Sequence, residues 1–519
     1  MSLSRTAVSL FLGCAFAVTL DAYILTSGKI ADHDPFVMGA VARRVAEGKS
    51  LYLDAWDNKP PLSLLFYYPS QAVAPRSYLA QQAFTCLWTA AQALVTFGLL
   101  YGERVWVRAV VAVLVLWMPL SRIDFAWGSS EDALNGFTMV LAVLGYRVLR
   151  DGTMRPALWM AAGLGAALAL HTRQPGVLFL MLPITALFVS GQTWDARAHA
   201  LALTTVGMAI GFVMVIGIML VVSNWEAYVD SMFRMPFRYT DVTHDVANRS
   251  PGLIPPSDSP STARSVGLSF FTMIGAKLPT MRSVLLYHFT TLATELLLAL
   301  PVLAVFVVRG RRWRLLVVVL VCIGLAVVMA PMKRFGHYHQ QLIPIFVLSA
   351  LLILRELHVA SPRLAGLVAA WLLTILFINV VLTAETLRAD GGEKAEMDAV
   401  VRLVESESRT GDTLFAVGQN SAYIYYRSTL EPCHTVHWDR FFDWLAPFLP
   451  QDVDTVMAAI VAAPPDWIVI GRNERETFLL RPHEAQEGIV RTGKLLRRLH
   501  RTYTYRVAHE VRHWVVLRR

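Results

Sequence analysis

The stretch that decides the fold is ALALTTVGMAIGFVMVIGIMLVV at 200–222, an unbroken apolar run without a single charged side chain. A helix needs roughly 20 mostly apolar residues to cross the hydrocarbon core of a bilayer. The length and composition of this run therefore predict a transmembrane helix.

Similar windows recur along most of the chain, and reading it in lengths of one span predicts about eleven transmembrane helices. They lie near 6–25, 80–101, 106–120, 132–149, 157–171, 175–190, 200–222, 284–308, 314–331, 341–355 and 364–384. The predicted fold class is thus mostly α, a polytopic helical bundle that occupies 1–384.

The composition of the whole chain supports a membrane protein. Of its 519 residues, 55% are hydrophobic and only 16% are charged, whereas a soluble domain has about 25% charged residues. This excludes a soluble enzyme and a disordered scaffold. The net charge of +9 is spread between apolar runs and forms no basic domain, so no nucleic-acid partner is expected.

The distribution of cationic residues gives the orientation, because short cytoplasmic loops are enriched in Lys and Arg. With the N-terminus inside, the short inner connections are rich in arginine, whereas the short outer ones carry only Arg122, Arg173, Lys333 and Arg334. Three longer segments then lie outside: 26–79, 223–283 and 385–519.

The last of these segments has the composition of a soluble domain. Short apolar runs at 413–417, 467–470 and 513–517 predict strands, and 453–462 predicts a helix between the first two. We therefore expect an extracytoplasmic α/β domain over 385–519.

Polar residues near membrane depth are costly and often functional, and the first such group is Asp32-His33-Asp34-Pro35. Proline is favoured at the first position of a helix, so Pro35 predicts a helix over 35–47 with Asp34 as its N-cap. A carboxylate at a membrane-edge cavity also suits a general base. The spacing alone leaves both interpretations open.

The second group is Trp56-Asp57-Asn58-Lys59 followed by Pro60-Pro61. Two prolines after a lysine present its ammonium group from a rigid, non-helical segment. Such a lysine suits a lipid phosphate, and it equally suits an interfacial anchor.

Two further groups lie at the outer ends of predicted spans. Ser130-Glu131-Asp132 suits the first turn of a helix as well as a catalytic carboxylate. The segment 333–341 gathers Arg334, His337 and Tyr338, which is typical of an anion site, and Arg173 adds a cation on the same side.

The sequence contains no pattern typical of a metal centre. The histidines of 333–341 do not have the spacing of a zinc site. The four cysteines give neither a disulfide framework nor metal-ligand spacing; they are Cys14, Cys86, Cys322 and Cys433.

Taken together, these residues resemble the GT-C membrane glycosyltransferases. Asp34, Ala42-Arg43, Gly48, Tyr52 and Lys59-Pro60-Pro61-Leu62 are similar to the first outer loop of the glycosyltransferase 39 family, which includes protein O-mannosyltransferases and the aminoarabinose transferase of lipid A. Ser130-Glu131 at the head of the fourth span, His337-Tyr338 and an outer C-terminal domain extend the resemblance over nearly the whole chain.

The resemblance implies transfer of a sugar from a polyprenyl-phosphate donor to an acceptor on the outer face, with inversion. Asp34 then matches the catalytic aspartate, and Glu131 or Asp132 is the only other carboxylate implicated. Lys59 matches the lysine that contacts the donor phosphate, and Arg334, His337, Tyr338 and Arg173 are expected to contribute to the same phosphate site.

The chain departs from the family pattern at two positions. Pro35 stands where many relatives have Glu, and Asn58 stands where an acidic residue is common. Both departures remove a carboxylate. No cofactor is therefore required by the sequence, although a divalent cation is compatible with it.

The expected partners are the lipid-linked donor, a cell-envelope acceptor (a glycolipid, lipid A, a glycan or a protein hydroxyl) and the bilayer. The expected location is a bacterial inner membrane, with the active site and the C-terminal domain on the periplasmic side. Two alternatives remain open: a transporter or flippase for a lipid-linked sugar, and a relative without catalytic activity.

Overall fold

The structure is a computed structural model. It describes residues 5–26, 34–57, 59–121, 129–152, 154–234, 299–329, 341–389, 392–418, 421–434, 453–475 and 490–519. The chain divides into two compact units, and each is built from segments that are far apart in the sequence.

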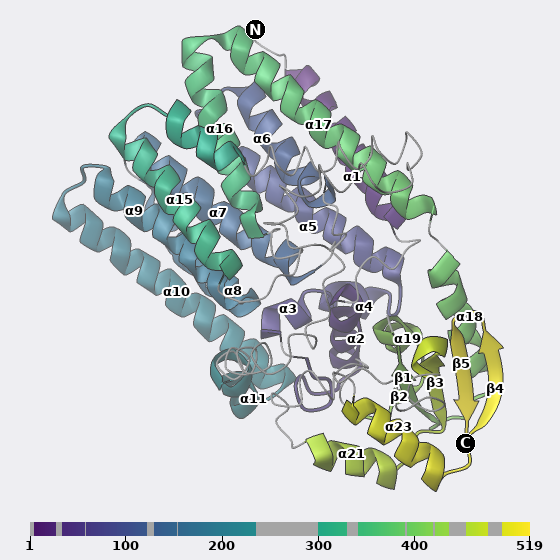
Figure 1. Ribbon diagram of the computed structural model, residues 1–519. Helices are drawn as coiled ribbons and strands as arrows, with labels where there is room; N and C mark the ends of the chain where they lie inside the picture. Colours follow the sequence, from purple (N-terminus) through teal and green to yellow (C-terminus); the bar gives the residue numbers. More distant parts are fainter. Residues whose placement is uncertain are drawn as a thin grey trace. The chain divides into compact units, whose positions relative to one another are not determined.

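The first unit is helical (Figure 1) and comprises Met1–Ser27, Gln82–Gly217 and Pro260–Ala389. By their bounds, α5 and α10 each extend past these ranges at one end. Its helices include α1 (Arg5–Thr26), α5 (Tyr78–Leu99), α6 (Val105–Trp117), α7 (Ser130–Asp151), α8 (Pro156–Thr172), α9 (Met181–Val189), α10 (Trp194–Val222), α15 (Arg311–Met329), α16 (Ile343–Ala360) and α17 (Pro362–Ala389). Residues 299–307 are also helical. The 3₁₀ turns η1 (Pro119–Ser121) and η2 (Gln174–Leu180) interrupt this series.

Four of the described helices are long and apolar enough to cross a membrane, namely α7, α10, α16 and residues Pro362–Val381 of α17. Shorter apolar helices occupy Thr6–Ala22, Val105–Trp117, Pro156–Thr172 and Gln174–Val189, where the sequence also predicts spans. A mostly helical chain with membrane-spanning segments is thus confirmed, whereas the number of eleven spans stays a prediction.

Helices α8 and α10 approach each other closely through small residues. A methyl group added at Gly163 of α8 would overlap the main chain of α10 at Thr204, and one at Gly207 of α10 would overlap the main chain of α8 at Met160. One turn further along α10, a methyl group at Gly211 would lie 2.6 Å from the Cβ atom of Ala167. Small residues one turn apart allow two helix backbones to pack closely within a membrane.

The second unit comprises Gly28–Gln81, Ile218–Ser259 and Asp390–Arg519. These segments correspond closely to the three that the sequence places outside the membrane. The described elements are α2 (Asp34–Ala46), α3 (Pro61–Leu65), α4 (Tyr68–Val73), α11 (Trp225–Val229), the π-helical turn η3 (Asp230–Arg234), α18 (Gly392–Glu407), α19 (Ser421–Arg427), α21 (Val453–Ala462), α22 (Arg472–Arg475), α23 (Val490–Thr502) and five strands.

The strands form one mixed sheet in the order β2-β1-β3-β5-β4. Strand β1 (Thr413–Val417) runs parallel to β2 (Glu431–Pro432) and β3 (Trp467–Gly471), and β5 (Trp514–Arg518) is antiparallel to β3 and to β4 (Arg506–Val511). The strands predicted at 413–417, 467–470 and 513–517 and the helix at 453–462 are confirmed, with shifts of one residue at the ends. That these elements form an extracytoplasmic domain stays a prediction.

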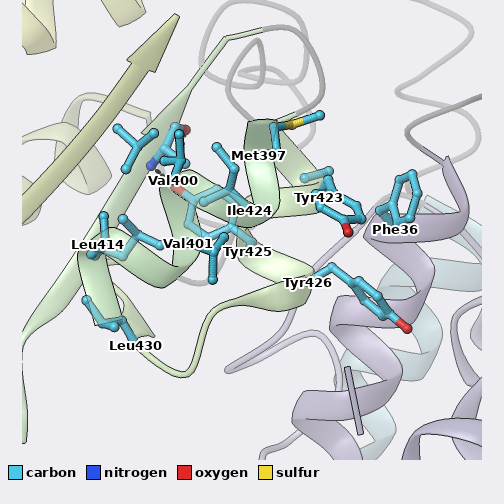
Figure 2. Close-up of a cluster of buried hydrophobic side chains, with 14 of the residues drawn as sticks. Phe36, Met397, Val400, Val401, Leu414, Tyr423, Ile424, Tyr425, Tyr426 and Leu430 are labelled. Atoms are coloured by element: carbon cyan, nitrogen blue, oxygen red, sulfur yellow. Dashed lines mark hydrogen bonds between the residues drawn. The ribbon is translucent and has the colours of Figure 1, made fainter. Parts of the chain in front are cut away.

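Helix α2 of the first outer segment is anchored in the aromatic core of this unit (Figure 2). The ring of Phe36 lies 4.9 Å from that of Tyr423 and 5.7 Å from that of Tyr426, both on α19, and 4.7 Å from that of Tyr78. Arg43, which is 2% exposed, donates hydrogen bonds to two carbonyl groups at the end of α19. These contacts fix the position of α2, and Asp34 is its first residue.

The close approach of α8 and α10 predicts that Gly207→Ala lowers the apparent melting temperature in detergent. The added methyl group would push the two backbones apart, and overpacking of this kind costs about 1–3 kcal/mol. The measurement is a thermal-unfolding scan of the purified protein.

Gly217→Ala in the same helix is the matched control, because no atom lies within 4 Å of the added methyl group. Since alanine is favoured over glycine inside a helix, this variant should melt at or above the wild-type temperature. Equal melting temperatures for the two variants would contradict the proposed packing.

Candidate functional site

The first candidate site lies at the start of helix α2, in the second unit. The helix predicted over 35–47 is observed as Asp34–Ala46, so Asp34 lies in its first turn. Carboxylates are stabilised at this end of a helix by the helix dipole. The side chain of Asp34 keeps an exposed fraction of 11% and is therefore not sealed from a ligand.

Lys59 brings the two motifs of the first outer segment together. Its Nζ atom lies 3.1 Å from Oδ1 of Asp34 and 3.3 Å from Oδ1 of Asp57. The side chain of Lys59 is 14% exposed, whereas that of Asp57 is 1% exposed. One ammonium group is thus shared between two carboxyl groups that differ in burial.

The main chain around Lys59 is held in place on both sides. The amide of Lys59 donates to Oδ1 of Asp57 at 3.1 Å, and its carbonyl oxygen accepts a hydrogen bond of 2.7 Å from the hydroxyl of Tyr52. Pro60 follows in an extended conformation, with φ −60° and ψ 157°, directly before helix α3. The two prolines therefore stop the chain from turning helical before position 61, and Lys59 stays in an open turn.

Burial and ion pairing act in opposite directions on these groups. Burial tends to lower the pKa of Lys59, but Asp34 and Asp57 outweigh it and hold that pKa above its usual value. For Asp57, burial raises the pKa of the carboxyl group, against the opposing effect of Lys59 and with a further increase from Asp34. Lys59 is therefore charged at neutral pH.

The second candidate site lies at the start of helix α7, in the first unit. Glu131 and Asp132 occupy the first turn of α7 and are both buried. Glu131 forms an ion pair with Arg173, which follows the last turn of α8, and its Oε2 atom accepts from the hydroxyl of Ser130 at 3.0 Å. Gln341 lies 3.5 Å from its other oxygen.

The backbone of Asp132 fixes the same turn. Its carbonyl oxygen accepts hydrogen bonds from Trp88 at 3.0 Å and from Gln92 at 3.2 Å, both on α5. The start of α7 is thus held by side chains of two neighbouring helices.

The structure therefore gathers the predicted residues into two clusters, one in each unit. Asp34 lies with Lys59, and Glu131 lies with Arg173, so Arg173 has a carboxylate partner in addition to the phosphate role expected for it. The other three predicted phosphate-site residues lie outside the described residues: Arg334, His337 and Tyr338. No group of three or more potential metal ligands occurs within the described part of the chain.

Sequence reasoning assigned no role to Asp57, although it lies closer to Lys59 in the sequence than Asp34 does. The sequence does contain an indication of this contact. Asp57 lies two residues before Lys59, and the two prolines that follow the lysine keep the segment rigid, so the carboxyl group is well placed to bind the lysine. Its near-complete burial became visible only in the structure.

No protein-family model and no curated protein matches the sequence. The solved structures that are similar to it include two of ArnT from Cupriavidus metallidurans. The apo structure is 14% identical, has a TM-score of 0.50, and the alignment covers 98% of this chain and 97% of that one. The structure bound to undecaprenyl phosphate is 12% identical with the same TM-score, and the coverage is 99% and 98%.

This chain has the fold of ArnT. The GT-C fold expected from the first outer loop is thereby confirmed over nearly the whole length of the chain. At this level of identity the likeness to ArnT establishes the fold, and the activity has to be argued from the residues.

The buried pair of Glu131 and Arg173 predicts that Arg173→Met destabilises the protein more than the double variant Glu131→Gln/Arg173→Met does. Removing one partner of a buried ion pair leaves the other charge unpaired, which costs about 3–5 kcal/mol. Apparent melting temperatures of the two single variants and the double variant measure this coupling. If the two single effects simply add, the pair contributes nothing to stability.

Proposed function

We propose that this protein transfers a sugar from a polyprenyl-phosphate-linked donor to a cell-envelope acceptor. The observation that carries the proposal is the contact between Asp34 and Lys59 in a chain with the fold of ArnT. A base and a cation at one point of the first outer segment are what such a transfer requires.

In this proposal Lys59 binds the donor phosphate. Hydrogen bonds between an ammonium group and a phosphate are charge-assisted and strong, and one of the ArnT structures holds undecaprenyl phosphate. A phosphate oxygen at Lys59 would compete with Asp34 for the same ammonium group. Binding of the donor therefore releases Asp34 from its ion pair at the moment when a base is needed.

Asp34 then acts as the general base. The acceptor hydroxyl attacks the anomeric carbon and gives its proton to Asp34, while the bond from that carbon to the phosphate oxygen breaks and the lipid phosphate leaves. One displacement inverts the anomeric configuration. Lys59 stabilises the charge that develops on the departing phosphate, and Arg334, His337, Tyr338 and Arg173 are proposed to add to this stabilisation.

The second cluster has a supporting part in the proposal. Glu131 and Asp132 are the remaining carboxylates of the expected site, and both lie buried in the first turn of α7. The ion pair with Arg173 fixes the position of the Glu131 side chain. We propose that Glu131 and Asp132 are further catalytic carboxylates of the transfer.

We further propose that the bundle has about eleven spans and lies in a bacterial inner membrane with the second unit on the periplasmic side. The three segments that make up the second unit support a location of all three on the same side of the membrane. These segments, which are separated in the sequence by apolar helices, fold as one compact body. Segments on opposite sides of a bilayer cannot do this.

The proposed base predicts that Asp34→Asn lowers transfer by at least about 100-fold, because the amide cannot accept the acceptor proton. The assay gives membranes a radiolabelled polyprenyl-phosphate sugar and follows the label into new products by thin-layer chromatography. Asp54→Asn in the same outer segment is the matched control and should keep wild-type transfer. Full transfer by the Asp34 variant would exclude the mechanism.

The proposed phosphate contact predicts that Lys59→Ala weakens binding of undecaprenyl phosphate by about 10- to 100-fold. This is the effect of losing a charge-assisted hydrogen bond of about 1.5–3 kcal/mol. Binding is measured by titrating the purified protein in detergent. Lys49→Ala in the same segment is the control, and an affinity unchanged in both variants would rule out the phosphate role of Lys59.

A further inference from the structure

Asp57 makes all its described polar contacts through one oxygen. Oδ1 accepts a hydrogen bond from the amide of Lys59 at 3.1 Å and lies 3.3 Å from its Nζ atom. Oδ2 is buried and has no hydrogen-bond partner within the described residues. The two oxygens of this carboxyl group therefore have very different environments.

The different environments of the two oxygens indicate whether the carboxyl group of Asp57 is protonated or ionised. An ionised carboxylate spreads its charge over both oxygens, so a buried oxygen without a donor pays a large desolvation cost. A hydroxyl group on the same atom is neutral and pays much less. The contacts of Oδ1 fit either form, whereas the environment of Oδ2 favours the protonated one, because an unpaired neutral hydroxyl costs less than an unpaired anionic oxygen.

The charges at the site lead to the same conclusion. If both Asp34 and Asp57 were ionised, the ammonium group of Lys59 would face two carboxylates, 3.1 and 3.3 Å away. Two like charges that share a site cannot both ionise freely, and the more buried group keeps its proton. The side chain of Asp57 is 1% exposed, against 11% for Asp34.

We propose that Asp57 is a neutral carboxylic acid with its proton on Oδ2, and that it is a positioning residue that orients Lys59 while Asp34 remains the single carboxylate of the site. The consequence for phosphate binding rests on the proposed function. The protonation state does not, because it follows from burial and hydrogen bonding.

The groups that face Asp57 are consistent with this assignment. Asp34 comes from α2, Lys59 from the same turn, and Tyr52 from the preceding turn. Burial raises the pKa of Tyr52, against a hydrogen bond with Ser231 of η3, so this hydroxyl is neutral and adds no charge. Lys59 is the only cation among these described neighbours, and Asp34 forms an ion pair with it.

A neutral Asp57 makes the cluster suitable for an anionic lipid. The pair of Asp34 and Lys59 has no net charge, and the ammonium group can exchange its carboxylate for a phosphate without an additional negative charge nearby. An ionised Asp57 would repel the phosphate at close range and low dielectric. The carboxyl group would then hinder the lipid that the site is proposed to bind.

Asp57→Asn tests the protonation state, because an amide has the shape and neutrality of the acid and its oxygen can accept the same hydrogen bonds. If Asp57 is protonated in the folded protein, the pKa of its carboxyl group is higher in the folded chain than in the unfolded chain. Between these two pKa values the folded chain holds a proton that the unfolded chain has released, so the wild type loses stability as the pH rises. The asparagine does not titrate. We therefore expect the melting temperature of the variant, minus that of the wild type, to increase from about pH 5 to about pH 8.

An ionised Asp57 predicts the opposite sign. Its pKa would then lie below that of the unfolded chain, and the wild type would gain stability relative to Asp57→Asn as the pH rises. If the melting temperature of Asp57→Asn minus that of the wild type decreases with pH, or does not change, the proposal is overturned. The measurement uses the full chain in detergent and needs no sugar donor, so its outcome is independent of the test of Asp34.

The positioning role has its own test with undecaprenyl phosphate as the probe. We expect Asp57→Asn to bind it within about twofold of the wild type at neutral pH, and Asp57→Ala to bind it about tenfold more weakly, because Lys59 loses the acceptor that orients it. Equal losses in both variants would show that the negative charge is required, and equal retention would show that Asp57 does not orient Lys59. Either result would overturn the proposal.

Discussion

The candidate site depends on how one partly buried ammonium group is paired. Lys59 is held between two carboxyl groups, and the two are not equivalent. Asp57 also binds the main chain of Lys59 and is sealed from solvent, whereas the side chain of Asp34 is partly exposed. A ligand can therefore displace Asp34 more readily than Asp57. This inequality is the reason why the proposed mechanism gives the role of the base to Asp34.

The rest of the second unit serves to keep Asp34 in place. Helix α2 follows directly from Asp34, and it is fixed by the rings around Phe36 and by Arg43, whose guanidinium binds the end of α19. Burial lowers the pKa of Arg43 to about 10, which still leaves it charged at neutral pH. A segment more than 300 residues downstream thus positions the first turn of α2, and the segment that carries Asp34 occurs in one compact body with the C-terminal sheet.

Local patterns in the sequence predicted local structure well. The apolar windows located helices such as α7, α10 and α16, and the strands at 413–417 and 467–470 followed from their buried apolar runs. Contacts between distant segments were not predictable in this way. The pairing of Glu131 with Arg173 and the anchoring of α2 on α19 depend on tertiary packing, for which hydrophobic periodicity carries no signal. The proximity of Asp34 and Lys59 was anticipated only through the family resemblance.

The position of the second carboxylate also explains how this chain differs from the pattern that it resembles. Asn58 occupies a position that is often acidic in the family, and Asp57 is its neighbour. Here Asp57 binds the backbone and the ammonium group of Lys59 from the buried side. The carboxyl group of Asp57 therefore holds Lys59 in place. Asp34 is the more exposed of the two carboxyl groups that contact the ammonium group of Lys59.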